Sequence, residues 1–167
     1  MPESNPLEIL LKHDRWATRN LLDACAALSH EQLHRRFEMG RGSVHDTAAH
    51  IVGAMRRWLD LLAGRPDRPR IDQDGKEHSI AELIALHEQL AEEFGQLARE
   101  RPLDDVINAE RGGKKYAFTR GAILVHVTTH GMHHRAQCLN MLRHLGVSPL
   151  PLSSVLEWMR AVDGTER

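Results

Sequence analysis

Hydrophobic residues recur every three or four positions in four long stretches of the chain, which is the period of an amphipathic helix. The stretches are polar on their remaining positions, so each helix has one apolar face to bury against the others. The sequence therefore predicts an all-α fold built as a four-helix bundle. The predicted helices cover residues 5–28, 43–63, 79–101 and 119–145.

Residues that favour helix ends mark most of these boundaries. Asn5 precedes Pro6 at the start of the first helix, an arrangement typical of an N-cap followed by the first helical residue. Gly146 follows the fourth helix and suits the left-handed backbone common at helix C-termini. Capping-box patterns occur at SHEQ 29–32, SIAE 79–82 and SVLE 154–157, and the last predicts a short helix to about residue 162.

Two connections are longer than a tight turn between helices. Residues 64–78 are rich in Pro, Gly and charge, which indicates a crossover connection along the bundle. Residues 103–119 contain two short runs with β propensity around Gly112 and Gly113, which predict either a small hairpin or a loop. No internal repeat or low-complexity tract divides the chain, so we expect residues 1–167 to form a single domain.

Four histidines lie within residues 126–137 of the fourth helix. His130 and His134 are one turn apart on the apolar stripe, a spacing that lets both imidazoles bind one ion. His126 lies one turn earlier on an adjoining row, whereas His133 is rotated by about 100° from His134. Two neutral histidines bonded within a core explain an isolated pair of this kind equally well.

A metal centre needs a third ligand from another helix, and His50 is the best candidate because it adjoins the buried stripe of the second helix. His45 is expected to be solvated in the first turn, and His13 and His87 are expected on exposed polar faces. Asp46 lies one turn before His50, so it either accepts the imidazole N–H of His50 or stabilises the helix N-terminus.

Three other polar residues near the cluster have two interpretations each. Gln137 either orients His134 or is an ordinary boundary residue, and Cys138 is expected in the core rather than as a ligand. Arg135 either orients an anionic substrate, or belongs to a solvated face or an interhelical salt bridge. No residue stands out as a general base, although His126 and Asp46 are candidates.

Composition narrows the classes of function. The chain has 22 basic and 23 acidic residues, which disfavours nucleic-acid binding, and 12 histidines. No apolar run approaches the roughly 20 residues that span a bilayer, so no membrane partner is expected. The N-terminus lacks the apolar segment of a secretory signal and there are two cysteines, which together predict a cytoplasmic protein.

The chain resembles the DinB family of the DinB/YfiT-like superfamily of metal-dependent enzymes. The resemblance rests on HDRWATRNLLDAC, SVHDTAAHIVGAMRRWLDLLAG and HVTTHGMHHRAQCLNMLRHLG, which occur in the right order along nearly the whole chain. It implies an up-down-down-up bundle, often dimeric, with a divalent metal on His50, His130 and His134. Relatives commonly carry Asn and Gly where this chain has Thr129 and Ala136, and neither difference removes a ligand.

The superfamily includes thiol-dependent S-transferases and a thiol-dependent maleylpyruvate isomerase. The resemblance and the spacing together suggest an enzyme that uses Zn²⁺, or else Ni²⁺, Fe²⁺ or Mn²⁺, to activate a small thiol or water against a small electrophile. The alternative is a non-catalytic metal-binding stress or scaffold protein. The expected partners are a small-molecule substrate and a second copy of the chain in a homodimer.

Overall fold

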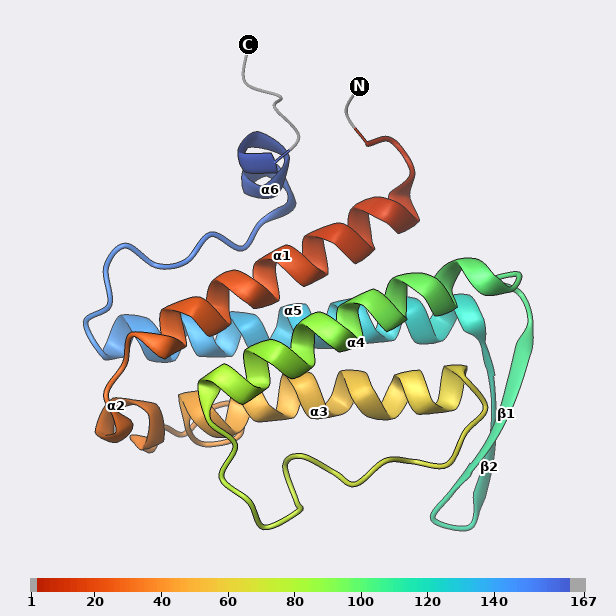
Figure 1. Ribbon diagram of the computed structural model, residues 1–167, viewed down its shortest axis with the longest axis horizontal. Coiled ribbons are helices and arrows are strands. Elements are labelled where there is room, and N and C mark those ends of the chain that lie inside the picture. Colours follow the sequence, from red (N-terminus) through yellow and green to blue (C-terminus); the bar gives the residue numbers. More distant parts are fainter. Residues whose placement is uncertain (1–2, 163–167) are drawn as a thin grey trace.

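The computed structural model of the protein describes residues 3–162. Within that range four long helices form a bundle, accompanied by two short helices and one hairpin (Figure 1). The long helices are α1 (Pro6–Ala26), α3 (Val44–Leu62), α4 (Ile80–Glu100) and α5 (Arg120–His144). The short elements are α2 (His30–His34), β1 (Val106–Arg111), β2 (Lys114–Thr119) and α6 (Val155–Val162).

The bundle has the predicted all-α architecture and up-down-down-up topology. Helices α1 and α5 run in one direction, and α3 and α4 run in the other (Figure 1). Both α1 and α3 pack against α4 and α5, so α1 and α3 lie diagonally across the bundle. Because α3 and α4 are parallel neighbours, the connection between them must return along the whole bundle, as predicted for residues 64–78.

The helices begin at the residues that the capping patterns indicated. The side chain of Asn5 accepts a hydrogen bond from the backbone N–H of Leu7 at 3.0 Å. Ser79 and Glu82 form a capping box. The backbone N–H of Glu82 donates to the hydroxyl of Ser79 at 3.2 Å, and the backbone N–H of Ser79 donates to the carboxylate of Glu82 at 2.7 Å. Each such cap contributes about 1 kcal/mol to the helix, because it satisfies backbone N–H groups that lack an intrahelical partner.

The segment before α5 is a hairpin rather than an irregular loop. Strands β1 and β2 are antiparallel, with Val106 opposite Thr119 and Arg111 opposite Lys114. Gly112 and Gly113 form the turn with φ of 57° and 74°, a left-handed conformation at both central positions that glycine adopts without strain.

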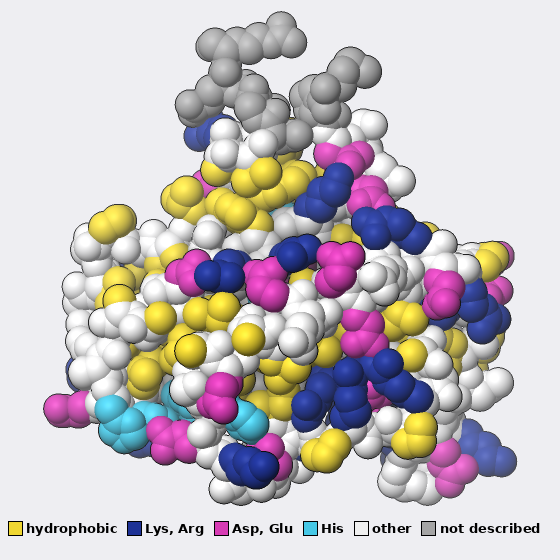
Figure 2. Space-filling view, viewed as in Figure 1, with side chains coloured by type: hydrophobic (Ala, Val, Ile, Leu, Met, Phe, Trp, Pro, Cys, Tyr) yellow, Lys and Arg dark blue, Asp and Glu magenta, His cyan; other side chains and the backbone are white. Residues whose placement is uncertain are grey.

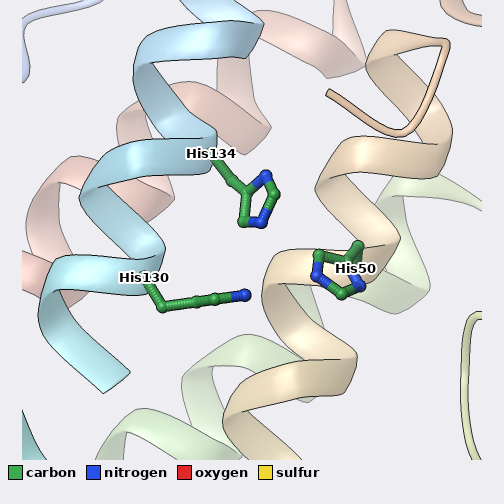
Figure 3. A group of neighbouring side chains, drawn as sticks. All are labelled: His50, His130 and His134. Carbon is green, nitrogen blue, oxygen red and sulfur yellow. The ribbon is translucent and has the colours of Figure 1, made fainter. Parts of the chain in front are cut away.

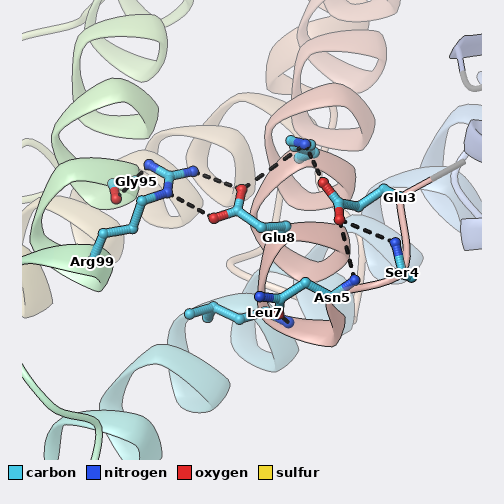
Figure 4. A network of polar contacts seen from close by, with 8 residues as sticks. Glu3, Ser4, Asn5, Leu7, Glu8, Gly95 and Arg99 are labelled. Carbon is cyan, nitrogen blue, oxygen red and sulfur yellow. Dashed lines mark hydrogen bonds and ion pairs between the residues drawn. The ribbon is translucent and has the colours of Figure 1, made fainter. Parts of the chain in front are cut away.

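Polar contacts join the first and third long helices at one end of the bundle (Figure 4). Arg99 of α4 donates from Nε and Nη2 to the two carboxylate oxygens of Glu8 in α1, both at 2.7 Å. Arg99 also donates to the carbonyl of Gly95, which fixes its orientation. The pair is exposed, so its contribution to stability is about 1 kcal/mol or less and the apolar core carries the fold.

Candidate metal centre

Helices α3 and α5 bring His50, His130 and His134 together between them (Figure 3). The ring centroid of His50 lies 5.1 Å from that of His130 and 4.7 Å from that of His134. The rings of His130 and His134 are 4.5 Å apart. One ligating nitrogen from each residue lies within 4.8 Å of the others, so the three can hold a metal ion.

Hydrogen bonds fix two of the three imidazoles. Nδ1 of His50 lies 3.3 Å from a carboxylate oxygen of Asp72, and Nδ1 of His134 lies 2.7 Å from the amide oxygen of Gln137. An oxygen acceptor at Nδ1 favours the tautomer with hydrogen on Nδ1 and a lone pair on Nε2. Both rings are therefore held with Nε2 available to an ion.

The surroundings favour the neutral form of two of the three imidazoles, those of His130 and His134. Burial, together with the charge of the neighbouring histidines, lowers the pKa of His130 to about 4. Burial also lowers the pKa of His134, although the hydrogen bond with Gln137 opposes that shift. Because a metal binds the unprotonated imidazole, these two ligands are ready to bind a cation at neutral pH without first losing a proton.

Asp72 occupies the position that the sequence suggested for Asp46. Asp72 lies in the connection between α3 and α4. Burial there raises its pKa, but hydrogen bonds from Arg70 and His50 outweigh that effect and hold the pKa below its usual value. Asp46 instead forms an ion pair with Arg36 at 2.9 Å and remains an acid of the first helical turn. No periodicity links Asp72 to His50, so only the fold reveals this contact.

A small cavity of about 120 Å³ adjoins the histidines. His50 and His130 line it, together with Trp58 and the guanidinium groups of Arg57, Arg70 and Arg111. Arg111, from strand β1, stacks over the ring of Trp58 at 4.7 Å. The cluster therefore opens to a space whose walls carry three arginines and one acid, Asp72, and this excess of positive charge suits a small anionic molecule.

Other residues of the histidine-rich segment have supporting positions. His126 packs its ring against Trp58 at 4.6 Å and lies outside the triad. His133 is exposed, and the amide nitrogen of Gln137 contacts its Nε2 at 3.1 Å. Gln137 therefore orients His134, as one of its two interpretations predicted, and Cys138 is fully buried in the core as expected.

Arg135 belongs to the bundle interior and does not line the cavity beside the histidines. It is 1% exposed and donates to Asp14 of α1 at 2.5 Å and to the hydroxyl of Thr18 at 2.8 Å. The predicted interhelical salt bridge is therefore confirmed, although it is buried rather than solvated. The charge of the Arg135 guanidinium is paired with the carboxylate of Asp14.

Three histidines expected at the surface are buried, and those predictions were wrong. His13 bonds through Nε2 to the carbonyl oxygen of Ser153 at 2.8 Å, and His45 bonds through Nε2 to that of His78 at 2.7 Å. His87 is 0% exposed within α4, and burial lowers its pKa to about 4. For His13 and His87 the expectation of exposure came from charged neighbours in the sequence. Residues adjacent on a helix point to different faces, so a charged neighbour does not show that a residue is exposed.

The fold and the cluster define a four-helix-bundle protein with a three-histidine pocket able to hold a metal ion between two of its helices. The chain belongs to the DinB family, whose model matches residues 1–164. It is similar to Protein DinB of Bacillus subtilis (strain 168), with 24% identity over 153 residues, covering 85% of this chain and 87% of that protein. None of the described helices is long and apolar enough to cross a membrane.

Proposed function

We propose that the protein is a metal-dependent enzyme that binds a divalent cation on His50, His130 and His134. The reaction is the attack of a small thiol, or of water, on a small electrophile. The observation that carries this proposal is that two of the three clustered imidazoles, those of His50 and His130, line a cavity, so the cluster is not closed by a fourth protein ligand. Three protein ligands with one open position are typical of catalytic zinc sites, whereas structural sites have four protein ligands.

When bound, the cation supplies Lewis-acid chemistry that lowers the pKa of a thiol or water, so that a nucleophile exists at neutral pH. In the thiol reaction the sulfur forms a bond to an electrophilic carbon, the displaced group leaves with its electron pair, and the thiol proton passes to solvent. Zn²⁺ suits three imidazoles best, and Ni²⁺, Fe²⁺ or Mn²⁺ also bind such ligands.

The chain's own side chains supply orientation and charge. Asp72 and Gln137 hold His50 and His134 in the ligating tautomer. Arg57 and Arg111 line the cavity beside His50, where they favour a substrate that carries a carboxylate or another anionic group. Trp58 supplies an apolar wall that limits the access of water to the electrophile.

Metal analysis of the purified protein tests the first half of this proposal. We expect one tightly bound ion that is lost in His130→Ala and kept in His144→Ala, a matched control in the exposed last turn of the same helix. Retention of the tight ion in His130→Ala would contradict the assignment of the ligands.

A kinetic panel tests the second half. Glutathione with carboxylated and uncharged electrophiles, and esters for the reaction with water, would be assayed with the metal-loaded protein and with Arg111→Gln. We expect metal-dependent turnover, with the anionic substrate preferred and that preference reduced in Arg111→Gln. A metal-loaded protein without turnover on any member of the panel would favour the non-catalytic alternative and leave the metal centre intact.

A further inference from the structure

A second cluster of potential metal ligands lies away from the three-histidine pocket, where α2 meets the connection that precedes α4. His30 and His34 are one turn apart on α2, and their ring centroids are 4.3 Å apart. Glu77 approaches both from the connection, at 3.5 Å from Nδ1 of His30 and 3.1 Å from Nε2 of His34. Figure 2 shows histidine and acidic side chains gathered on this part of the surface, near the α2 end of the bundle.

The distances suit a shared ion. Zinc lies about 2.1 Å from imidazole nitrogen and carboxylate oxygen, so the ligand atoms of a tetrahedral site are about 3.4 Å apart. The two contacts with Glu77 are within a few tenths of an ångström of that value. All three ligand atoms lie within 4.8 Å of one another, so the histidine nitrogens need only a modest approach, which exposed side chains permit.

The surroundings restrict these side chains without closing the site. The ring of His45 packs against that of His34 at 4.6 Å, and His45 is itself fixed by the carbonyl oxygen of His78. A cavity of about 350 Å³, lined in part by His30, His34 and Glu77, lies beside the cluster. A bound ion would therefore keep at least one position for solvent or a small ligand.

Imidazole nitrogen and carboxylate oxygen are ordinary ligands of a divalent transition-metal ion, which can bind two imidazoles and one carboxylate together. From this geometry we infer that His30, His34 and Glu77 form a second binding site for a divalent transition-metal ion. The site joins α2 to the connection that also carries Asp72, and it does not depend on the proposed catalytic function.

Exposure sets the expected affinity. The side chain of His30 is 77% exposed and that of Glu77 is 60% exposed, so binding must order side chains that are largely exposed to solvent. The ion at this site should therefore dissociate more readily than the ion on the interior triad, and it should be lost first during dialysis against a chelator. Ions high in the Irving–Williams order, Cu²⁺ and Zn²⁺, should bind best.

Equilibrium dialysis of the chelator-treated full-length protein with Zn²⁺ alone tests this inference. We expect two ions per wild-type chain, one in His34→Ala, one in Glu77→Gln, one in His130→Ala and none in His34→Ala combined with His130→Ala. His144→Ala should keep both ions. Circular dichroism of each variant would establish that the helices remain, which we expect because His34 and Glu77 lie outside the buried core.

The variants separate failure of this site from failure of the triad. One ion in the wild type and none in His130→Ala would overturn the second site while supporting the triad. Two ions in both His34→Ala and Glu77→Gln would overturn the second site as well. One ion in the wild type that disappears in His34→Ala but survives in His130→Ala would support the second site and contradict the triad.

Discussion

Removing the carboxylate of Asp72 should weaken metal binding at the triad without unfolding the bundle. Asp72 lies outside the helices, in the connection between α3 and α4, and its side chain is 11% exposed. It accepts from Nδ1 of His50 and is itself held by Arg70 at 3.1 and 3.2 Å. Losing it frees the imidazole of His50 to rotate and to adopt the other tautomer.

The contact between Asp72 and His50 indicates how much metal affinity the substitution should remove. Groups that orient metal-binding histidines typically change affinity by 10- to 100-fold, which corresponds to about 1.4 to 2.7 kcal/mol. Asp72→Asn keeps an oxygen acceptor for Nδ1 but loses the negative charge, so we expect a loss of about tenfold. Asp72→Ala removes both, and we expect a loss closer to 100-fold.

Competition with a chromophoric chelator at pH 7 would measure these affinities in the metal-free protein. Asp46→Asn is the control, since Asp46 is an acid on α3 whose carboxylate pairs with Arg36 instead of His50. Its affinity should equal that of the wild type. Wild-type affinity in Asp72→Ala, with affinity lost in His50→Ala, would refute the argument that Asp72 orients the ligand.

Two further predictions concern stability in the presence of a chelator. The folded pKa of His87 is about 4 against 6.5 unfolded, so the folded state binds fewer protons between those values and loses stability as pH falls through them. Chemical denaturation should show that the free energy of unfolding of His87→Leu, relative to that of the wild type, rises by about 3 kcal/mol when the pH falls from 7 to 4. If the free energies of unfolding of the two proteins changed with pH in parallel, this prediction would be contradicted. Arg135→Met should lower the free energy of unfolding by about 3 to 5 kcal/mol, because it leaves Asp14 buried and unpaired. Adding Asp14→Leu to this variant should restore stability, and a double variant as unstable as Arg135→Met would refute that cause.

Much of the fold follows from local sequence signals. Apolar periodicity determines which face of each helix is buried, and residues such as Asn5 and Ser79 determine where helices begin. The His130 and His134 pair is equally local, because a spacing of four residues places two side chains on one helical face. His50 could be added because its helix had to pack its stripe against the same core.

Contacts made by irregular segments could not be derived in this way. Asp72 and Glu77 belong to a connection with no periodicity, and their partners depend on how that connection returns along the bundle. The sequence offered Asp46, one turn before His50, as one candidate for this contact, but the carboxylate of Asp46 pairs with Arg36. The burial of His87 was also missed, since hydrophobicity alone treats a histidine beside charged residues as exposed.

The connection between α3 and α4 therefore contributes to chemistry as well as topology. A parallel pair of neighbouring helices requires a connection that spans the bundle, and here that segment places Asp72 against His50 and Glu77 against α2. Only four residues lie between the two carboxylates, so one short part of the segment contributes to both clusters. A bundle with a tight turn at this point would keep the three histidines but would lose the group that orients His50.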